Sequence, residues 1–425
     1  MTENTILLSI FTRIKNLICD RVFIEESKTK SSFFSRPSRC KLTFQMLVLF
    51  LLTAAKKSIQ VELDLFLSEV NAMCLSYSKQ AFSKRRNCVK WEAIRKIYQE
   101  ATMQFYQEAK YETFHGYLLA AIDGSKLNLP DSEELSNAFG SQITGGTAQN
   151  QALASCAFDV LNELYLDAII APCKSSERAL ALQHIENIKK YAFDKVLYIF
   201  DRGYPSSELI QTVAENNRSY LFRCDKSFVR SMKLHGNDCT VQHRFAKLSN
   251  EIELRVVRFM LNETTEEILV TNIPADELSV EEMKELYHLR WGIESSYNCA
   301  KNTIQLEDFS GISEMAVRQD FYAAMFLYNI GSIHIFEQKP AFDAAHNSKN
   351  NKYQYKQDRA VTIGILKPQV TRMVLTDSPL TKSLILLRIA HQTTRATTRI
   401  EPGRKFLRKK KHLSMKHPQN SRHVI

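Results

Sequence analysis

Residues 287–301 read Tyr-His-Leu-Arg-Trp-Gly-Ile-Glu-Ser-Ser-Tyr-Asn-Cys-Ala-Lys, and four polar side chains recur in this stretch at helical spacing. Offsets of three, four and seven positions separate Tyr287, Arg290, Glu294 and Lys301. On one helix these offsets keep the side chains on the same flank. An isolated helix of this kind is more often a solvated face of ion pairs. The functional interpretation therefore depends on the acids found upstream.

Two further carboxylates follow short apolar runs. Residues 117–122 lead into an Asp-Gly pair at Asp123, and residues 195–200 lead into an Asp-Arg-Gly triplet at Asp201. Short apolar runs closed by glycine predict buried strands, and the carboxyl ends of such strands carry the sites of α/β folds. Each Asp alone is more often a turn or cap residue. Together with Glu294, the two form a set that suits hard cations and phosphate-ester chemistry.

Three motifs occur in one order along the chain. They are residues 123–140, which begin with Asp-Gly; the Phe-Asp-Arg-Gly-Tyr segment 200–204; and the Tyr-x2-Arg-x3-Glu-x6-Lys pattern of 287–301. In this order and spacing they resemble the DDE transposases of the insertion-sequence-four group, relatives of the transposon-five enzyme. The resemblance covers about residues 35–370. The helical pattern is specific, whereas the two shorter pieces would be weak alone.

The resemblance implies an α/β fold with a ribonuclease-H-like catalytic core, interrupted by a β-rich insertion and preceded by an all-α N-terminal DNA-binding domain. It implies a DNA transposase of a bacterial insertion sequence that binds the terminal inverted repeats and target DNA. Cleavage and strand transfer would follow a cut-and-paste route through a hairpin, although the residues alone do not distinguish this route from a replicative one. A homodimer on paired ends is implied too.

The chemistry expected of this set is two-metal phosphoryl transfer. Asp123, Asp201 and Glu294 are the predicted catalytic residues and would hold two Mg²⁺ or Mn²⁺ ions per active site. Carboxylate ligands argue against zinc. The assignment of individual ions to individual acids is left open.

The residues around Glu294 are candidates for DNA contacts. Arg290 can grip a phosphate bidentately and Lys301 can do so as a point charge, while Tyr287 offers a hydroxyl. Trp291 could stack on a displaced base. Packing of the helix against the sheet is the slightly better explanation for that tryptophan.

Residues 1–115 have the patterns of an all-helical domain. Ser78 is a plausible N-cap for a short basic helix, whose cations are Lys79, Lys84, Arg85 and Arg86. A short basic helix after a turn resembles the recognition element of a helix-turn-helix. A solvated basic face is an equally good explanation.

The stretch between Asp201 and Glu294 is too long for a simple connection. Its β-rich segments predict an insertion domain at 221–275, so that the catalytic core comprises 116–220 and 276–345. Arg223 in this insertion could line a DNA channel, or could serve solubility only. A C-terminal region at 346–425 ends in a basic tail, which could follow a DNA backbone.

Composition limits the classes of protein further. The net charge of +11 favours a polyanionic partner such as nucleic acid. The nine cysteines form no C-x-x-C pair, which favours a reducing compartment. The most apolar segment, 46–55, is too short to span a bilayer. These features predict a cytoplasmic protein without a membrane partner, and the resemblance implies that it is bacterial and nucleoid-associated. The alternatives are a DNA-binding protein without catalysis and a plain Mg²⁺-dependent nuclease.

Overall fold

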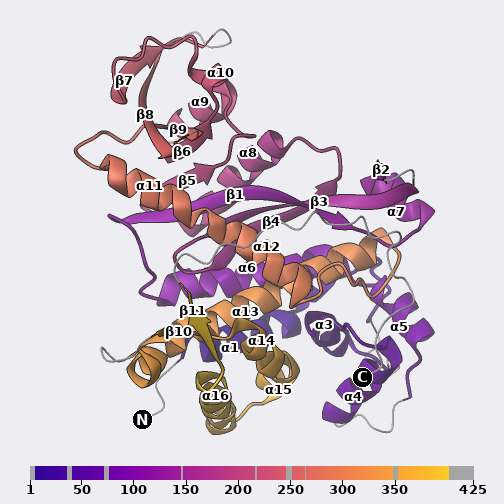
Figure 1. Ribbon diagram of the computed structural model, residues 1–425. Helices are drawn as coiled ribbons and strands as arrows, with labels where there is room; N and C mark the ends of the chain where they lie inside the picture. The colour runs from indigo at the N-terminus through magenta and orange to yellow at the C-terminus, as the bar shows by residue number, and fades with distance from the viewer. Residues whose placement is uncertain are drawn as a thin grey trace. The chain divides into compact units, whose positions relative to one another are not determined.

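The structure, a computed structural model, describes most of the chain as two compact units (Figure 1). The described residues are 5–35, 41–70, 76–144, 147–215, 218–245, 251–263, 265–347 and 353–401. The helical unit comprises the described residues of Met1–Lys110, Lys126–Ala152 and Cys299–Ile425, and the sheet unit comprises those of Tyr111–Ser125 and Leu153–Asn298. Most of the predicted basic tail lies outside the described residues.

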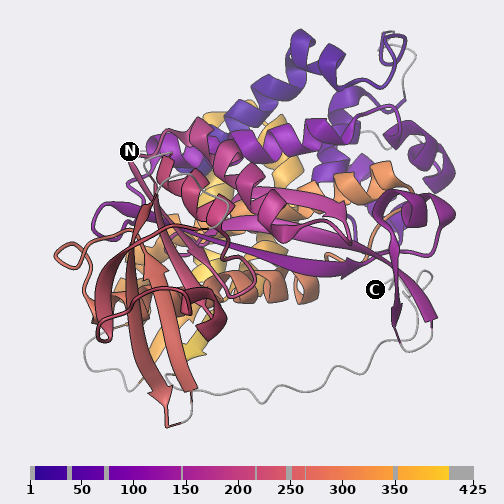
Figure 2. The same ribbon diagram turned by 90° about the horizontal axis from the view of Figure 1, so that it is seen from above.

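A mixed β-sheet forms the centre of the sheet unit (Figures 1 and 2). Its strands are β1 (Tyr117–Asn128), β3 (Thr147–Asp159), β4 (Leu164–Pro172), β5 (Lys195–Phe200), β6 (Ser219–Cys224), β7 (Asp238–His243), β8 (Ile252–Asn262) and β9 (Thr265–Thr271). β4 pairs with β3, and the order continues β3-β1-β5-β6-β9-β8-β7. β1, β5 and β6 are parallel. Three strands, a helix, a strand, a helix and a strand make the ribonuclease-H-like arrangement, which confirms the predicted fold class.

The sequence pattern from residue 117 predicts three strands, a helix, a strand and a helix, and the first helices of this unit follow the strands in that order. The helices of the unit are α8 (Glu177–Ile188), η2 (Lys189–Tyr191), α9 (Ser207–Glu215), α10 (Lys226–Val229), α11 (Val280–Leu289) and α12 (Trp291–Asn302). Ser176 caps α8 by accepting from the Ala179 N–H, and Ser279 closes a full capping box with Glu282 at the start of α11. These caps satisfy N–H groups that a helix leaves unpaired.

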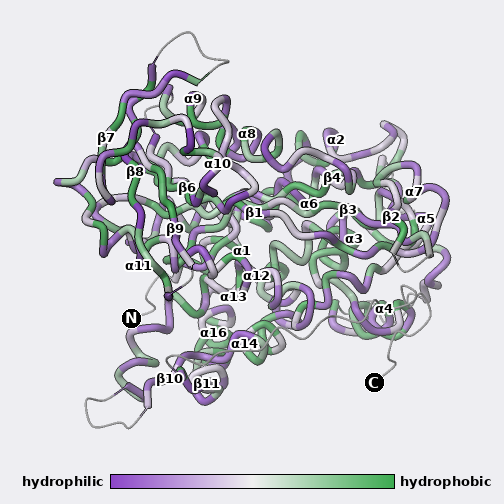
Figure 3. Tube along the Cα trace, turned by 45° about the horizontal axis from the view of Figure 1, so that its top comes forward, coloured by the Kyte–Doolittle hydropathy of each residue, from purple (hydrophilic) through white to green (hydrophobic). Residues whose placement is uncertain are grey.

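The predicted insertion does not form a sheet of its own. β9 pairs antiparallel with β6, β8 with β9, and β7 with β8, so the inserted strands extend the sheet that contains β1, β5 and β6. This pairing covers the unpaired N–H and C=O groups that the edge of β6 would otherwise present. Much of β8 is hydrophobic (Figure 3), and residues 254–257 are all buried, so both faces of the strand are covered there.

Two local predictions were wrong. β1 does not end at Asp123 but continues to Asn128, because the polar residues after the acid alternate in the manner of a half-exposed strand. The polar composition of residues 128–149 predicts a loop, but the segment contains α7 (Glu133–Phe139) and β2 (Ser141–Thr144). The two segments next to it form β3 and β4, as predicted.

Helices dominate the helical unit. Its N-terminal helices are α1 (Ile6–Cys19), α2 (Arg21–Ser27), α3 (Phe44–Leu52), α4 (Ile59–Glu69), α5 (Lys79–Arg86) and α6 (Trp91–Glu108). The later elements are α13 (Glu314–His346), β10 (Gln354–Gln357), α14 (Arg359–Leu366), η3 (Lys367–Gln369), α15 (Val370–Leu375), α16 (Pro379–Thr394) and β11 (Thr397–Ile400). The predicted helical character of the N-terminal region is confirmed.

The long helix α13 is the core of this unit. It has 33 residues and is buried almost continuously from Ala316 to His334, as expected for the apolar part of this segment. It packs beside α6, where the Trp91 and Tyr322 rings stack at 5.4 Å. The polar composition of about residues 339–357 predicts a loop, but the helix continues past Pro340 to His346. The core helix therefore belongs with the N-terminal helices rather than with the sheet.

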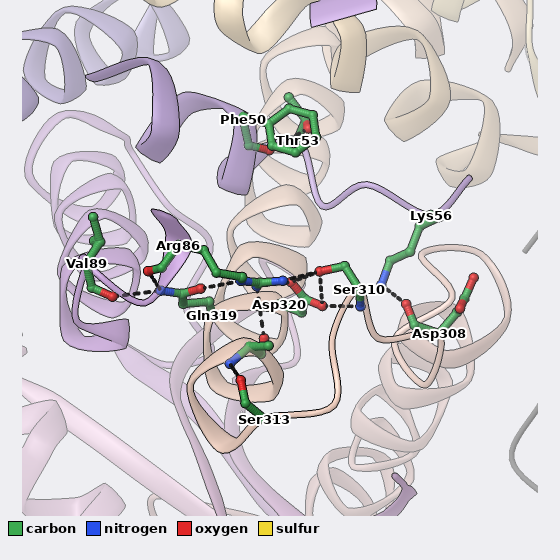
Figure 4. Close-up of polar contacts among 11 residues, drawn as sticks. Phe50, Thr53, Lys56, Arg86, Val89, Asp308, Ser310, Ser313, Gln319 and Asp320 are labelled. Atoms are coloured by element: carbon green, nitrogen blue, oxygen red, sulfur yellow. Dashed lines mark hydrogen bonds and ion pairs between the residues drawn. The ribbon is translucent and has the colours of Figure 1, made fainter. Parts of the chain in front are cut away.

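Arg86 does not share the exposed face of α5 with the other predicted cations. Its residue is 2% exposed, and its guanidinium donates to Gln319 at 2.9 Å, to Ser310 at 2.6 Å and to Asp320 at 2.9 Å (Figure 4). Burial alone would raise the pKa of Asp320, but Arg86 and the donors of Ser310 outweigh burial and lower that pKa. The prediction that this side chain lies on a DNA-binding surface was therefore wrong, because the buried carboxylate of α13 requires a cation.

No helix among the described residues is both long and apolar enough to cross a membrane. The cysteines of the described ranges are all free thiols.

Replacing Arg86 by Met should lower the free energy of unfolding by about 3–5 kcal/mol, because Asp320 would be left as an unpaired buried charge. Urea denaturation measures the effect. The matched control is Lys84→Met on the same helix, where an exposed cation is lost and a change within about 0.5 kcal/mol is expected. Equal effects of the two substitutions would contradict the buried pair.

The buried carboxyl group of Glu337 should make the stability of the fold depend on pH. This carboxylate of α13 accepts from the Ile6 N–H at the start of α1, and burial raises its pKa to about 7 despite that donor. A raised folded pKa stabilises the fold below the unfolded value of about 4.5, and this stabilisation is lost as the pH rises toward 7.

The stability of Glu337→Gln relative to the wild type should therefore rise as the pH increases from 5 to 8, by up to about 3 kcal/mol. Urea midpoints at the two pH values measure the gain, and the exposed Glu92→Gln on α6 serves as control. A difference between variant and wild type that does not change with pH would refute the raised pKa.

Candidate active site

The three predicted acids meet at one guanidinium. Asp123 lies within β1, Asp201 directly follows β5, and Glu294 lies in α12. Arg290 Nη2 is 2.9 Å from Glu294 Oε1 and 3.8 Å from Asp201 Oδ2, and Arg290 Nη1 is 3.8 Å from Asp123 Oδ2. Three acids that are far apart in the sequence therefore surround the same side chain.

The parallel pairing of β1 and β5 brings the two aspartates together. Ile122 is the register partner of Phe200, so Asp123 and Asp201 leave neighbouring strands at the same level. Equal register at one edge of a parallel pair places consecutive side chains side by side. Asp201 therefore lies at the carboxyl end of its strand as predicted, whereas Asp123 lies beside it but within β1.

The helix that carries Arg290 and Glu294 is interrupted. α11 ends at Leu289 and α12 begins at Trp291, whereas one continuous helix was expected. At the junction the Arg290 N–H bonds to Tyr287 O and the Ile293 N–H bonds to Arg290 O. These i→i+3 bonds make a tighter turn than an α-helix. Arg290 and Glu294 still face each other across one turn.

Tyr287 and Arg223 support Asp201. The Tyr287 hydroxyl donates to Asp201 Oδ1 at 3.0 Å, and Arg223 Nη1 is 3.8 Å from the same oxygen. Arg223 also pairs at 3.0 Å with Glu267, which is 2% exposed. The expected channel residue of the insertion therefore contacts the acid cluster, together with a buried carboxylate from β9.

The two aspartates differ in their titration. Burial raises the pKa of Asp123 to about 6, although the Gly124 N–H and Arg290 oppose the shift. Burial also acts on Asp201, but the Arg202 N–H, Arg290 and the Tyr287 hydroxyl together lower its pKa. Asp201 is therefore held as a carboxylate more firmly than Asp123.

Two residues near Asp123 were not among the predicted site residues. Tyr204 is 1% exposed and its hydroxyl has no hydrogen-bond partner among the described residues. Burial raises the pKa of Tyr204 well above its usual value, and the charges of Asp123, Glu177 and Asp201 raise it further. Tyr204 closes the Asp-Arg-Gly-Tyr motif, so the sequence did carry a signal for it. For Glu177 the sequence carried no signal other than the position of this residue at the start of a helix.

The chemistry of the donors fits a hard divalent cation. Within the described ranges, Asp123 Oδ2, Asp201 Oδ2 and Glu294 Oε2 accept no hydrogen bond, and carboxylate oxygens are the ligands that Mg²⁺ and Mn²⁺ prefer. As placed, the acids face the guanidinium, and no group of three or more acidic, histidine or cysteine side chains in the described residues is arranged to hold an ion.

The other predicted DNA contacts are distributed over both units. Trp291 is 50% exposed, which argues against the expected packing role. Lys301 lies in the helical unit, where it donates to Lys126 O at 2.6 Å. On α5, Lys79 and Lys84 are exposed, while the Arg85 guanidinium lies 3.9 Å from the centre of the Phe34 ring.

A second group of polar side chains in the sheet unit resembles the catalytic triad of a hydrolase. His184 is 2.7 Å from Asp167 Oδ2 and 3.0 Å from Ser155 Oγ. All three residues are 0% exposed, so no substrate can reach the hydroxyl. The group satisfies buried polar atoms between β3, β4 and α8, and it is structural.

Comparison with protein families assigns the chain. The family described as "Transposase DDE domain" matches residues 114–330, which is just over half of the chain. This range includes Asp123, Asp201 and Glu294. The chain belongs to the DDE transposase family, as the sequence motifs predicted.

Curated relatives point to the same group. The chain is 26% identical over 255 residues to the transposase InsG for insertion sequence element IS4 of Escherichia coli K12, an alignment that covers 56% of this chain and 57% of the relative. It is 28% identical over 151 residues to the putative transposase InsZ of the same strain, covering 34% and 49%. The chain thus spans about half the length of the curated relatives it matches.

Among solved structures, a piggyBac transposase in a synaptic complex with hairpin DNA aligns with a TM-score of 0.48 and 11% identity, over 91% of this chain and 84% of that one. A likeness at this level adds no argument about fold or function.

Replacing Tyr204 by Phe should leave the free energy of unfolding unchanged or raise it by about 1 kcal/mol, because the variant removes a buried hydroxyl that lacks a partner. The matched control is Tyr191→Phe, whose hydroxyl donates to Leu166 O at 2.8 Å. That variant should lose about 1 kcal/mol. Urea denaturation compares the two, and equal losses would show that Tyr204 has a partner in solution.

Proposed function

We propose that the chain is the DNA transposase of a bacterial insertion sequence, which binds the terminal inverted repeats of its element and carries out metal-dependent strand cleavage and strand transfer. One observation supports this above all others. Three carboxylates from β1, the end of β5 and α12 lie around one buried guanidinium, inside the range matched by the family.

In this proposal Asp123, Asp201 and Glu294 hold two Mg²⁺ or Mn²⁺ ions, which would activate the attacking oxygen and stabilise the leaving one. Asp201, which carries the lowered pKa, is already ionised at neutral pH. Tyr287 and Arg223 fix its side chain. Arg290 holds Glu294 and lies 3.8 Å from both aspartates, so it positions the three acids. Its Nε and Nη1 atoms are buried and have no hydrogen-bond partner in the described residues.

DNA contacts outside the acid cluster complete the proposal. The half-exposed Trp291 offers a ring on which a displaced base can stack. Lys79 and Lys84 present exposed cations on a short helix, as a DNA-end-binding element would. Arg86 is excluded from this surface by its burial. Lys301, in the last turn of α12, is proposed to contact the DNA backbone. The hairpin route, the synaptic homodimer and the cytoplasmic, nucleoid-associated location remain predictions from the resemblance.

The plain nuclease is the second candidate, since it would use the same three acids. It has no need for recognition of element ends. A DNA-binding protein without catalysis is less well supported, because it gives no reason for three carboxylates to meet at Arg290.

The test uses the full chain and a linear DNA that carries the gene with its native flanking sequence, in Mg²⁺. We expect nicks at the boundary of an inverted repeat. Asp201→Asn and Glu294→Gln should each lower the cleavage rate by about two to three orders of magnitude, because a charge that stabilises the transition state is lost. Binding to the same DNA, followed by gel shift, should persist.

Asp276→Asn is the matched control: it removes an exposed carboxylate of the same unit and should cut normally. Cleavage by either acid variant at the wild-type rate would overturn the proposed catalytic residues. Nicks at random positions would favour the plain nuclease instead.

A further inference from the structure

Strand register places Arg223 beside Asp201 on the sheet. β5 pairs parallel with β6, and the pairing ends with Phe200 opposite Phe222. Asp201 and Arg223 are the residues that follow directly, so their side chains lie at neighbouring positions on the same face of the sheet. Arg223 Nη1 is accordingly 3.8 Å from Asp201 Oδ1.

The insertion supplies a carboxylate to the same arginine. β9 pairs with β6 so that Leu269 is opposite Arg223. Glu267, two residues before Leu269, therefore lies diagonally across from Arg223 on the same face, and its Oε2 is 3.0 Å from Arg223 Nη2. Because β5, β6 and β9 are consecutive in the sheet (Figure 1), Arg223 stands between Glu267 and Asp201.

The guanidinium of Arg223 is held on three sides. Glu267 binds Nη2, Nη1 faces Asp201, and the centre of the Tyr287 ring lies 5.7 Å from the guanidinium carbon, within the range of a cation–π contact. Tyr287 also donates to Asp201 Oδ1 at 3.0 Å. The 3.8 Å separation between Arg223 and Asp201 exceeds the length of a hydrogen bond. Arg223 therefore stands beside Asp201 without hydrogen-bonding to it.

Stability alone does not explain the ion pair between Glu267 and Arg223. The Glu267 side chain is 2% exposed and that of Arg223 is 22% exposed. Removing both charges from water costs about as much as their attraction returns, and an apolar pair of similar volume is often as stable. Burial raises the pKa of Glu267, while the charges of Arg223, Arg202 and Arg290 oppose that rise. The pair is explained if the direction of the Arg223 guanidinium matters for the acid that it faces.

Two carboxylates compete for this one guanidinium. Without Glu267, Arg223 would lose its closest partner and would be free to close the 3.8 Å gap to Asp201, because arginine binds carboxylates in a close, bidentate geometry. Such a bond would occupy the oxygens that Asp201 needs for the proposed cleavage. Glu267 therefore determines how closely Arg223 approaches Asp201.

We propose that Glu267 is a positioning residue for DNA cleavage, which holds Arg223 beside Asp201 and keeps it from bonding to that acid. The inference rests on the proposed function and deepens it, since it gives a strand of the insertion a part in the chemistry. Glu267 touches no reacting atom and acts only through Arg223.

The first experiment measures single-turnover cleavage by the full chain in Mg²⁺, with protein in excess over the linear DNA that carries the gene and its native flanking sequence. Glu267→Gln should lower the rate constant at least about tenfold, because a small displacement of a catalytic group has an effect of this size. Binding of the same DNA, followed by gel shift, should stay as in the wild type. Glu267→Asp keeps the charge and should lose less, so it maintains the test if Glu267→Gln does not fold.

The matched control is Glu266→Gln on the same strand. Glu266 also forms an ion pair, with Lys226 at 2.9 Å, but it is not part of the row that contains Asp201 and Arg223. This variant should cut at the wild-type rate. Equal slowing by Glu266→Gln and Glu267→Gln would show a general effect of charge on β9 and would overturn the inference.

The second experiment needs neither DNA nor turnover. In Glu267→Gln the guanidinium should turn to Asp201, so Asp201→Asn should lower the midpoint of urea unfolding by more in this background than in the wild type. The excess should vanish when Arg223→Met is also present. A merely structural role of Glu267 gives shifts that add, and additive shifts would refute the inference.

The outcomes separate this inference from the proposed function. If the wild type cuts at the repeat boundary and Glu267→Gln cuts as fast, Glu267 has no positioning role and the proposed function stands. If the wild type does not cut, the proposed function fails, and the positioning role fails with it whatever the urea midpoints show.

Discussion

The structure of the sheet unit depends on a buried guanidinium surrounded by carboxylates. A cation such as Arg290, which is 2% exposed, is tolerated in an interior only when its charge is compensated. Here the compensation comes from three acids on three separate elements. The positions of β1, β5 and α12 are consequently linked, because each element must bring its acid to Arg290 for the charge of the guanidinium to be balanced. The interaction that stabilises the fold at this point is the same one that gathers the candidate catalytic groups.

The sheet provides the frame for this cluster. Parallel pairing of β1 with β5 and of β5 with β6 sets Asp123 and Asp201 side by side, and the strands of the insertion continue the same sheet through β9. The insertion also contacts the site, since Arg223 on β6 pairs with Asp201 and with the buried Glu267 on β9. A β-rich segment predicted to be a separate domain thus supports one of the acids.

The helical unit follows the same rule of buried charge. Asp320 on the core helix α13 is compensated by Arg86 from α5 and by Ser310. The ends of α5 therefore serve different purposes. Lys79 and Lys84 remain exposed near its beginning and middle, while its last residue holds the helix against α13. The short basic helix keeps its orientation because one of its cations is buried.

The sequence motifs predicted the family, and the resemblance they carry predicted the fold class. Local signals singled out the three candidate acids: apolar runs followed by Asp, and the spacing of Tyr287, Arg290 and Glu294 on a helix. Tertiary structure decided what those signals do not encode. It determined that Arg86 is buried, since the partner Asp320 is far along the chain, and that the insertion extends the sheet that contains β1, β5 and β6, since strand pairing depends on which edge is free. It also brought Glu177 of α8 close to Gly124 and buried the Tyr204 hydroxyl without a partner among the described residues. Local patterns reflect the periodicity of one element, whereas the partner of a charge is chosen only when distant elements pack.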